Sequence, residues 1–331
     1  MKAWVIDAGD GSAPAQASLR FADVEEPRAG AGELLLEIRA VGLNRADLSR
    51  RAGHYERIAT RPPAPIAGLE AAGTVMAVGP GVEGFSPGDR VMGMPSGAYA
   101  ERALLDARLA MRVPAGMAWT DAAALPVATF TAHDALVTAG RLRPGDTVLV
   151  QGASSGVGIA ALQIACWLRA ARVIGTASSP SRIEALRAYG LTDGIERPGA
   201  VAEQVMAITG GRGADVVIDM AGGGAIADSL GACALGARWV QVGRMGGPRG
   251  EIDLDLLSRK RVSLVGVTFR TRGVVEFAAV VRNAEHDLSA ALAAREIAMP
   301  LSAVFPFAEA ESAQQAMRSN EHLGKIVLQM P

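Results

Sequence analysis

A glycine-rich segment carries the clearest chemical signal in this sequence. Residues 148–158 read VLVQGASSGVG. Gly152, Ser154 and Gly156 match the Gly-x-Ser-x-Gly turn that exposes a nucleophilic serine in hydrolases. Gly152, Gly156 and Gly158 equally match a turn that binds a dinucleotide, which occurs in short-chain reductases and in longer two-domain reductases. The choice among these three interpretations depends on the residues around the turn.

Two of the interpretations lack the partner residues that they need. A serine hydrolase requires an acid and a histidine later in the chain and an oxyanion loop earlier. Only His286 and His322 follow Ser154, neither follows a strand that would return it over that serine, and no His-Gly-Gly segment precedes it. A short-chain reductase requires Tyr-x-x-x-Lys, and none of the three tyrosines has a lysine four residues later. The pattern therefore favours a dinucleotide site inside a longer, two-domain protein.

The elements around the turn support this interpretation. A strand-like run leads into the glycines, and a small, apolar helical stretch follows them. Further short apolar runs alternate with helical stretches at residues 171–177, 214–222, 237–243 and 261–269. This alternation predicts a doubly wound parallel sheet with helices on both faces. The amides of residues 156–158 would then point at a diphosphate from a helix N-terminus.

The rest of the chain predicts a second domain. The first 120 or so residues are rich in Gly, Pro and alternating apolar runs, which is typical of β-structure. A long helical stretch is predicted at about 273–294, followed by a strand in HLGKIVLQM at residues 322–330. Because this last strand has no helical partner, we expect it to return to the first domain. The predicted fold class is therefore α/β with two domains.

The residues after the second predicted strand bear on the choice of nucleotide. NAD-binding turns usually place an acid there for the ribose hydroxyls, but this chain has Ser178, Ser179 and Arg182. Hydroxyls and a guanidinium suit a 2′-phosphate, which favours NADPH. Alternatively, Ser179 is a helix cap and Arg182 a solvated residue. After the third strand, Arg197 could stack on adenine or pair with the phosphate, whereas Glu196 could repel that phosphate.

Composition limits the possible partners. The chain has 331 residues, of which 50% are hydrophobic and 20% charged, and its formal net charge is −1. This balance offers no basic surface for nucleic acid or an anionic membrane. No apolar run reaches the roughly 18 residues of a transmembrane helix, and the start lacks the features of a signal peptide. We therefore expect a cytoplasmic protein, in keeping with only two cysteines far apart in the sequence.

Six segments resemble, in order, those of a known family. They are VGLNRADLSRRAGHY (41–55), AAALPVATFTAHDAL (122–136), GADVVIDMAGG (213–223), VGRMGG (242–247), VTFRTR (267–272) and HLGKIVL (322–328). Together they resemble the zinc-independent, zeta-crystallin-like quinone oxidoreductases of the medium-chain dehydrogenase/reductase superfamily. The resemblance implies a GroES-like, β-rich catalytic domain at residues 1–123 and 268–331 and a Rossmann NADPH-binding domain at 124–267. It also implies a homodimer formed through the sheet edge of the cofactor domain.

The same comparison argues against a metal site. Relatives that are alcohol dehydrogenases hold a catalytic zinc with a cysteine and a Gly-His-Glu segment. The matching positions here are Asn44 and the segment Gly68-Leu69-Glu70, and the four-cysteine lobe of those relatives is missing. Tetrahedral zinc sites need clustered Cys or His ligands. We therefore expect no metal.

The resemblance also implies a reaction. Hydride from C4 of the nicotinamide would reach a quinone or an α,β-unsaturated carbonyl, and the developing oxyanion would need hydrogen-bond donors in place of a metal. Tyr55 and Asn44 are the candidate catalytic residues, although Tyr55 could instead only line the cleft. Reductases of enoyl thioesters carry a similar Gly-x-Tyr, so an enoyl-CoA or enoyl-carrier-protein reductase is the alternative enzyme. A nicotinamide-binding protein with little catalysis is a third possibility.

The remaining expected residues are cofactor contacts. Thr131 resembles a position that touches the nicotinamide, or else its hydroxyl bonds back to a helix carbonyl. Lys325 resembles a residue near the cleft, or else is a solvated lysine. The other expected contacts are Gly152, Ser154, Ser155, Gly156, Val157, Gly158, Ser178, Ser179, Arg182, Arg197, Ala221, Gly222, Val242, Gly243, Arg244, Phe269 and Arg270.

Overall fold

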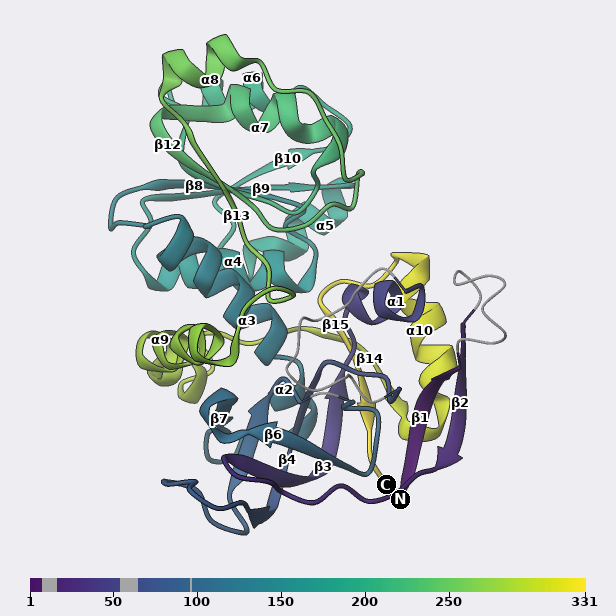
Figure 1. The fold of residues 1–331 in the computed structure, drawn as a ribbon. Helices are drawn as coiled ribbons and strands as arrows, with labels where there is room; N and C mark the ends of the chain where they lie inside the picture. The colour runs from purple at the N-terminus through teal and green to yellow at the C-terminus, as the bar shows by residue number, and fades with distance from the viewer. Residues whose placement is uncertain (8–16, 54–64, 96) are drawn as a thin grey trace. The chain divides into compact units, whose positions relative to one another are not determined.

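The chain folds into two compact units, which are described separately. The structure, a computed structural model, describes residues 1–7, 17–53, 65–95 and 97–331 (Figure 1). One unit comprises Met1–Val127 with Phe269–Pro331, and the other comprises Ala128–Thr268. The first boundary therefore lies four residues later than expected, and the second lies one residue later.

The Ala128–Thr268 unit contains a six-stranded parallel sheet in the order β10-β9-β8-β11-β12-β13. The chain starts in the middle at β8, winds outward through β9 and β10, and then returns to build the other half. The order therefore reverses between β8 and β11, which is where open α/β sheets bind ligands. The strands are β8 (Thr147–Gln151), β9 (Arg172–Ala177), β10 (Asp193–Glu196), β11 (Ala214–Asp219), β12 (Cys233–Gln241) and β13 (Ser263–Gly266).

Helices follow most of these strands, as a doubly wound sheet requires. They are α4 (Gly156–Trp167), α5 (Pro180–Arg187), α6 (Val201–Ile208), α7 (Ile226–Ala232) and α8 (Leu254–Lys260). Every residue of β8 is buried, and so are residues 158–165 of α4. Helix α4 is buried along most of its length because its side chains are small and apolar. On one face of the sheet, Leu149 and Trp239 pack with Val201 and Val205 in a single apolar cluster.

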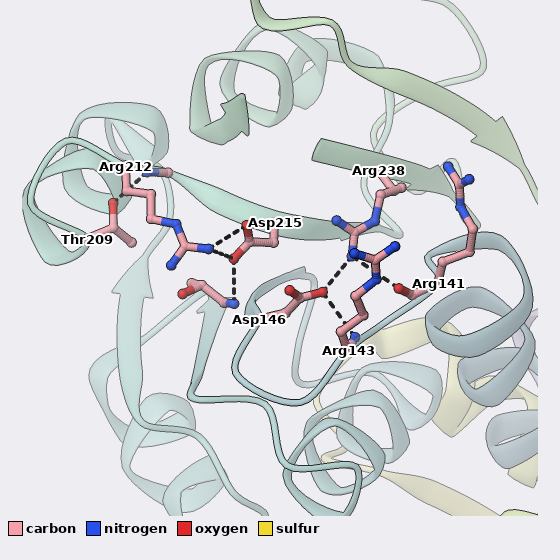
Figure 2. Close-up of polar contacts among 9 residues, drawn as sticks. Arg141, Arg143, Asp146, Thr209, Arg212, Asp215 and Arg238 are labelled. Atoms are coloured by element: carbon pink, nitrogen blue, oxygen red, sulfur yellow. Dashed lines mark hydrogen bonds and ion pairs between the residues drawn. The ribbon is translucent and has the colours of Figure 1, made fainter. Parts of the chain in front are cut away.

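An ion pair and hydrogen bonds join the amino ends of β8, β11 and β12 (Figure 2). Arg238 of β12 lies 2.5 Å from the carboxylate of Asp146, which precedes β8, and also donates to the carbonyl oxygen of Gly140 at 2.7 Å. Asp215 of β11 accepts from Arg212 and from the amide of Thr147, both at 2.8 Å. These contacts hold the three central strands in register at the end of the sheet opposite to the glycine turn.

The other unit is built mainly on antiparallel pairs, with β14 and β15 as a parallel pair. Strands β1 (Lys2–Asp7) and β2 (Ser18–Asp23) form a hairpin-like pair. A seven-stranded sheet has the order β14-β15-β3-β4-β5-β7, with β6 paired to β3. Its strands are β3 (Glu33–Gly42), β4 (Glu70–Val78), β5 (Arg90–Gly93), β6 (Arg102–Asp106), β7 (Ala110–Arg112), β14 (Leu301–Pro306) and β15 (Lys325–Gln329). Its helices are α1 (Arg45–Arg51), α2 (Trp119–Ala123), α9 (Val274–Ala293) and α10 (Ala310–Ser319).

Two features of this unit matter for the site. Strand β15 pairs antiparallel with the end of β3, with Val327 opposite Gly42, so the last strand does return to the first domain. Helix α3 (Pro126–His133) runs across the first boundary and continues into a π-helical segment, Asp134–Ala139. Among the helices of the described residues, none combines the length and the apolar character needed to cross a bilayer.

Candidate functional site

The glycine turn joins β8 to α4 and is fixed to the neighbouring strand. Gly152 has φ +79°, a left-handed conformation that favours glycine. Its amide donates to Thr176 Oγ1 at 3.0 Å, and the amide of Ala153 donates to the carbonyl oxygen of Thr176 at 2.9 Å. The end of β9 therefore holds the turn beside the point where the strand order reverses.

At the start of α4, the backbone leaves room for a ligand to approach closely. Ser155 caps the helix, because its Oγ accepts from the amide of Gly158 at 3.1 Å and donates to the carbonyl oxygen of Gly152 at 2.9 Å. A Cβ on Gly158 would lie 2.6 Å from that same oxygen, so only glycine fits. The amides of Gly156 and Val157 are in the first turn, where no helix carbonyl can accept them. This arrangement suits a diphosphate, which would take those amides and the positive end of the helix dipole.

A guanidinium lies beside this turn. Arg182 of α5 places its Nη1 3.5 Å from Ser154 Oγ. Ser179 is the N-cap of α5 and accepts from the Arg182 amide at 3.3 Å, while Ser178 is exposed. Helix capping is therefore one role of Ser179. The positive charge and the hydroxyls at the end of β9 match the site that a ribose 2′-phosphate needs.

Arg197 contacts different groups from those that Arg182 contacts. Its Nη1 donates to Gln151 Oε1 at 2.9 Å and lies 3.6 Å from a carboxylate oxygen of Asp228. Asp228 thus balances its charge within the same unit. Of the two arginines expected near the adenosine phosphate, the structure joins Arg182 to the glycine turn and pairs Arg197 with an acid.

Asp219 fixes the conformation of the loop after β11. Asp219 was not identified from the sequence. Its buried carboxylate accepts from the amides of Ala221 and Gly222 at 2.8 and 2.9 Å and from Ser229 Oγ at 2.8 Å. Ala221 and Gly222, both expected contacts, therefore owe their conformation to this acid. The available signal was an acid at the end of an apolar strand just before a glycine pair.

The loop after β12 packs closely on the loop after β11. The amides of Val242 and Gly243 both donate to the carbonyl oxygen of Asp219, at 2.8 and 3.1 Å. A Cβ on Gly243 would lie 2.5 Å from the carbonyl oxygen of Met220, which explains the glycine. A cavity of about 290 Å³ opens beside these loops, lined by Gly222, Gly223, Ile226, Trp239, Gln241, Arg244, Gly247, Pro248, Ile252, Leu264 and Gly266.

A buried polar cluster lies in the other unit, where β3, β4 and β15 adjoin. Asn44, the N-cap of α1, donates from its Nδ2 to Glu70 Oε1 at 2.7 Å and accepts from Lys325 Nζ at 2.8 Å. Lys325 also forms an ion pair with Glu70, whose other oxygen accepts from the amide of Val127 at 2.7 Å. Glu70 and Lys325 are 0% and 3% exposed. Lys325 is therefore not a solvated surface lysine.

Asp47 completes this cluster. Its Oδ2 accepts from the backbone amide of Asn44 at 2.8 Å, and the side chain is buried. Burial raises the pKa of Asp47 to about 7, and the negative charge of Glu70 acts in the same direction. The bond from Asn44 and the charges of Lys325 and Arg50 oppose the rise without cancelling it.

Three further expected residues are distributed over both units. Thr131 is 9% exposed within α3. Phe269 is buried and stacks on Phe277 with ring centroids 4.5 Å apart, and Arg270 follows it at partial exposure. Tyr55 lies outside the described residues.

The donors in the polar cluster do not fit a zinc ion. Within residues 1–7, 17–53, 65–95 and 97–331, no group of three or more His, Cys, Asp or Glu side chains could hold a metal. At Asn44 and Glu70, the cation beside the carboxylate is the ammonium of Lys325. An amide oxygen, a carboxylate and an ammonium are not the N and S ligand set of a zinc site.

Comparison with known proteins identifies the family. Residues 30–115 match the alcohol dehydrogenase GroES-like domain, and residues 156–288 match the zinc-binding dehydrogenase domain. The synaptic vesicle membrane protein VAT-1 homolog of Homo sapiens is 33% identical over 321 residues, which are 91% of this chain and 80% of that protein. Erythronolide synthase EryA2 of Saccharopolyspora erythraea is 36% identical over 98% of this chain.

Solved structures of related proteins superpose on almost the whole chain. The mycobacterial protein Rv1454c, solved as a complex with NADPH, superposes with a TM-score of 0.86 at 30% identity, covering 99% of this chain and 100% of that one. The quinone oxidoreductase of Thermus thermophilus, also known as an NADPH complex, gives a TM-score of 0.81 at 33% identity over the same shares.

The chain belongs to the medium-chain dehydrogenase/reductase superfamily and, within it, to the quinone oxidoreductase family. It has the GroES-like domain and the Rossmann-type domain that its sequence predicted. The chain spans only 9% of EryA2 and 15% of a mycocerosic acid synthase-like polyketide synthase of Mycobacterium tuberculosis, to which it is 35% identical.

Proposed function

We propose that this protein is an NADPH-dependent reductase that transfers hydride to a quinone or an α,β-unsaturated carbonyl without a zinc ion. The observation that carries the proposal is the contact of Arg182 with Ser154 at the glycine turn. It places a guanidinium where an NAD-specific site has an acid. The NADPH complexes of two related structures support the same nucleotide.

The residues of the Ala128–Thr268 unit fit the nucleotide. The space that Gly158 leaves beside Gly152, and the first-turn amides of Gly156 and Val157, receive the diphosphate. Arg182, with Ser178 and Ser179, receives the 2′-phosphate. When bound, the nicotinamide supplies a hydride from its C4 atom. Thr131, Val242 and Arg244 of this unit remain proposed contacts for the rest of the cofactor, as do Phe269 and Arg270 of the other unit.

Asn44 is set up as a hydrogen-bond donor toward the substrate oxygen. Lys325 holds the Oδ1 atom of Asn44, so the amide nitrogen faces the other way. One of its N–H groups donates to Glu70 at 2.7 Å, while the other lies 3.5 Å from the carbonyl oxygen of Gly42, the outer limit of a hydrogen bond. That weakly held N–H, together with the phenol of Tyr55, would stabilise the oxyanion that forms as hydride arrives.

A second candidate is the reduction of an enoyl thioester. The similarity to EryA2 and to the mycobacterial polyketide synthase covers 98% and 95% of this chain, so almost the whole fold is shared with a segment of those enzymes. The chemistry is the same in kind, because a conjugated carbonyl accepts hydride at its β-carbon and then needs a proton. The residues at Asn44, Glu70 and Lys325 would serve either substrate.

Initial rates of NADPH oxidation distinguish these possibilities. The panel consists of 1,4-benzoquinone, 9,10-phenanthrenequinone, a simple enone and crotonyl-CoA, each with NADPH and with NADH. We expect turnover of a quinone or an enone with NADPH preferred. Turnover of crotonyl-CoA alone supports the second candidate. Tight NADPH binding without turnover of any substrate contradicts both and leaves a nicotinamide-binding protein.

We also propose a homodimer. Strand β13 forms one edge of the six-stranded sheet, and three of its four residues are exposed. Leu264 on this strand is 43% exposed and Leu254 nearby in sequence is 70% exposed. An exposed apolar edge strand pairs readily with a second copy. Light scattering should give twice the mass of one chain, and Leu264→Lys should give the mass of one chain.

A further inference from the structure

Three buried polar side chains of the GroES-like unit are not used by the proposed reaction. Asp47, Tyr99 and Gln314 are 3%, 0% and 1% exposed. Within the described part of the chain, Asp47 Oδ1, Tyr99 Oη and Gln314 Nε2 are buried and have no hydrogen-bond partner. Buried polar atoms nearly always have a partner, so three orphans in one place call for an explanation.

The three side chains converge from different segments. Gln314 of α10 accepts from Arg51 of α1 at its Oε1, at 3.1 Å, so its Nε2 is turned away from Arg51. Figure 1 shows α1 beside α10, and the ion pair of Arg51 with Glu311 joins the two helices. The ring of Tyr99 packs against Gly68, where a Cβ would lie 2.3 Å from the ring.

Asp47 and Gln314 both act electrostatically on the Tyr99 hydroxyl, so the three side chains lie in one region of the unit. Burial raises the pKa of the Tyr99 phenol well above its ordinary value, and the nearby charge of Asp47 raises it further. The approach of the Gln314 amide lowers the pKa, although the geometry falls short of a hydrogen bond. Asp47 and Tyr99 therefore lie close enough to interact electrostatically, and both are buried.

The charges in this region do not balance if both carboxyl groups are ionised. Glu70 and Asp47 are two buried acids, whereas Lys325 is the buried ammonium that faces them. Glu70 accepts from three donors: Lys325, the side chain of Asn44 and the amide of Val127. Asp47 accepts only the amide of Asn44 in the described contacts. A buried charge without a partner is costly, so the less supported acid is the one that takes a proton.

We propose that Asp47 works as a neutral carboxylic acid and, in this form, positions Asn44. Its Oδ2 accepts the backbone amide of Asn44, and its proton sits on Oδ1, facing Tyr99. With Asp47 neutral, Glu70 and Lys325 form a balanced pair, and Lys325 keeps its bond to Asn44 Oδ1. Loss of the proton adds a second negative charge that competes for the ammonium of Lys325 and loosens the side chain of Asn44.

The burial of Asp47 favours its neutral form, in agreement with this assignment. A pKa of about 7 leaves the group mostly protonated in mildly acidic solution. The charged or titratable groups that face it are Arg50 of its own helix, Glu70 of β4, Lys325 of β15 and Tyr99 of the segment before β6. Arg50 is partly exposed and donates to the carbonyl oxygen of Gly68 at 3.3 Å, so water screens much of its effect.

Infrared spectroscopy tests where the proton is, without substrate or cofactor. The carbonyl stretch of a protonated carboxyl should be present at about pH 5.5, disappear by about pH 8.5, and be missing from Asp47→Asn at every pH. Tyr99→Phe removes the neighbour of the proton, so it should shift the frequency of that band. Asp23→Asn, at an exposed acid paired with Lys2, is the control and should leave the band unchanged. If wild type and Asp47→Asn give the same spectra at about pH 5.5, the proposal is overturned.

Whether Asp47 positions Asn44 must be measured separately from the location of the proton. This measurement should not depend on activity alone, because a catalytic role of Asn44 rests on the proposed function. The side-chain amide resonance of Asn44, assigned with Asn44→Ser, should titrate with the midpoint of Asp47 in wild type and stay constant in Asp47→Asn. Where turnover is measurable, wild-type kcat/KM should fall about 10-fold for each pH unit above that midpoint, and Asp47→Asn should stay level. An Asn44 resonance that titrates identically in both proteins contradicts the positioning role. Absence of turnover, with the resonance behaving as expected, contradicts only the proposed function.

Discussion

Asn44 Oδ1 and Lys325 Nζ lie 2.8 Å apart although 281 residues separate them in the chain. The sheet explains the contact. Strand β15 begins at Lys325 and pairs with β3, which ends at Gly42, two residues before Asn44. The returning last strand therefore delivers the ammonium that orients the Asn44 amide and balances Glu70.

Replacing Lys325 tests how much the fold depends on this pair. Lys325→Met leaves the Glu70 carboxylate buried without its cation, so the free energy of unfolding should fall by about 3–5 kcal/mol. Chemical denaturation measures the change. The double variant Lys325→Met/Glu70→Gln should recover much of the loss, because it removes the unpaired charge. Lys2→Met, at the exposed pair with Asp23, should cost less than about 1 kcal/mol. Equal losses for Lys325→Met and Lys2→Met would contradict the buried pair.

Replacing Arg182 tests the assignment of the 2′-phosphate. Arg182→Ala removes a charge-assisted contact worth about 1.5–3 kcal/mol, so the Kd for NADPH should rise about 10- to 100-fold. The Kd for NADH should hardly change, since that nucleotide has no 2′-phosphate. Titration of nicotinamide fluorescence measures both. Arg187→Ala on the same helix, where the guanidinium pairs with Glu184, is the matched control. A parallel loss of NADPH and NADH affinity would show that Arg182 does not read the phosphate.

The close packing around Gly158 predicts that any larger residue at this position is destabilising. A Cβ at position 158 would lie 2.6 Å from the carbonyl oxygen of Gly152 and 2.7 Å from Ala153 Cα. Gly158→Ala must therefore displace the turn or the start of α4, at a cost of about 1–3 kcal/mol in unfolding free energy. It should weaken NADPH binding in addition. Gly224→Ala, where a Cβ meets nothing within 4 Å, is the control. Unchanged affinity in Gly158→Ala would argue against close approach of a diphosphate at this position.

Tyr55 is proposed as the second donor to the substrate oxygen. Tyr55→Phe keeps the ring and removes only the hydroxyl, so kcat/KM should fall by about 10²–10³. The Kd for NADPH should stay unchanged. Together, these two results distinguish a catalytic role of the hydroxyl from a role in which Tyr55 only lines the cleft. Steady-state rates with the best quinone or enone measure the first value. A fall of less than threefold would leave Tyr55 as a lining residue.

The titration of Asp47 predicts how stability depends on pH. Burial moves its pKa from 3.8 to about 7, so the folded protein binds this proton more tightly than the unfolded chain does. The contribution of Asp47 to unfolding free energy is therefore full below 3.8 and is lost as the pH rises through about 7. The span corresponds to about 4 kcal/mol.

Asp47→Asn should lack this dependence. Its amide oxygen can still accept the backbone amide of Asn44, and it carries no charge at any pH. Denaturant unfolding of both proteins from about pH 4 to about pH 8 gives the difference between them, which should change in favour of the variant as the pH rises. A constant difference over this range would place the pKa of Asp47 near its ordinary value.

The features that could be predicted from the sequence are the local ones. The strand, glycine turn and helix at residues 147–167 follow from apolar runs and glycine spacing, and Ser179 as a helix cap follows from the proline after it. Family resemblance added Asn44 and Lys325, which lie far apart in sequence. The structure then brought these two residues together in one cluster.

Long-range burial could not be predicted in the same way. Asp219, Tyr99 and Gln314 have polar side chains in ordinary sequence surroundings, and only the fold shows that each is at most 1% exposed. The ion pair of Arg197 could not be predicted from the sequence either. The position of Arg197 after the third strand predicts a contact with adenine or the phosphate, and this stays a prediction. Its pairing with Asp228 depends on where α7 packs, which no local pattern reveals.

Isothermal titration of the metal-free protein with NADPH, and in parallel with NADH, tests the nucleotide preference on which the proposed function depends. We expect one NADPH site per chain, with an affinity at least about 10-fold higher than for NADH, because the guanidinium of Arg182 lies beside the glycine turn. Binding of NADH at equal or greater strength, or no binding of either nucleotide at millimolar concentration, would contradict it.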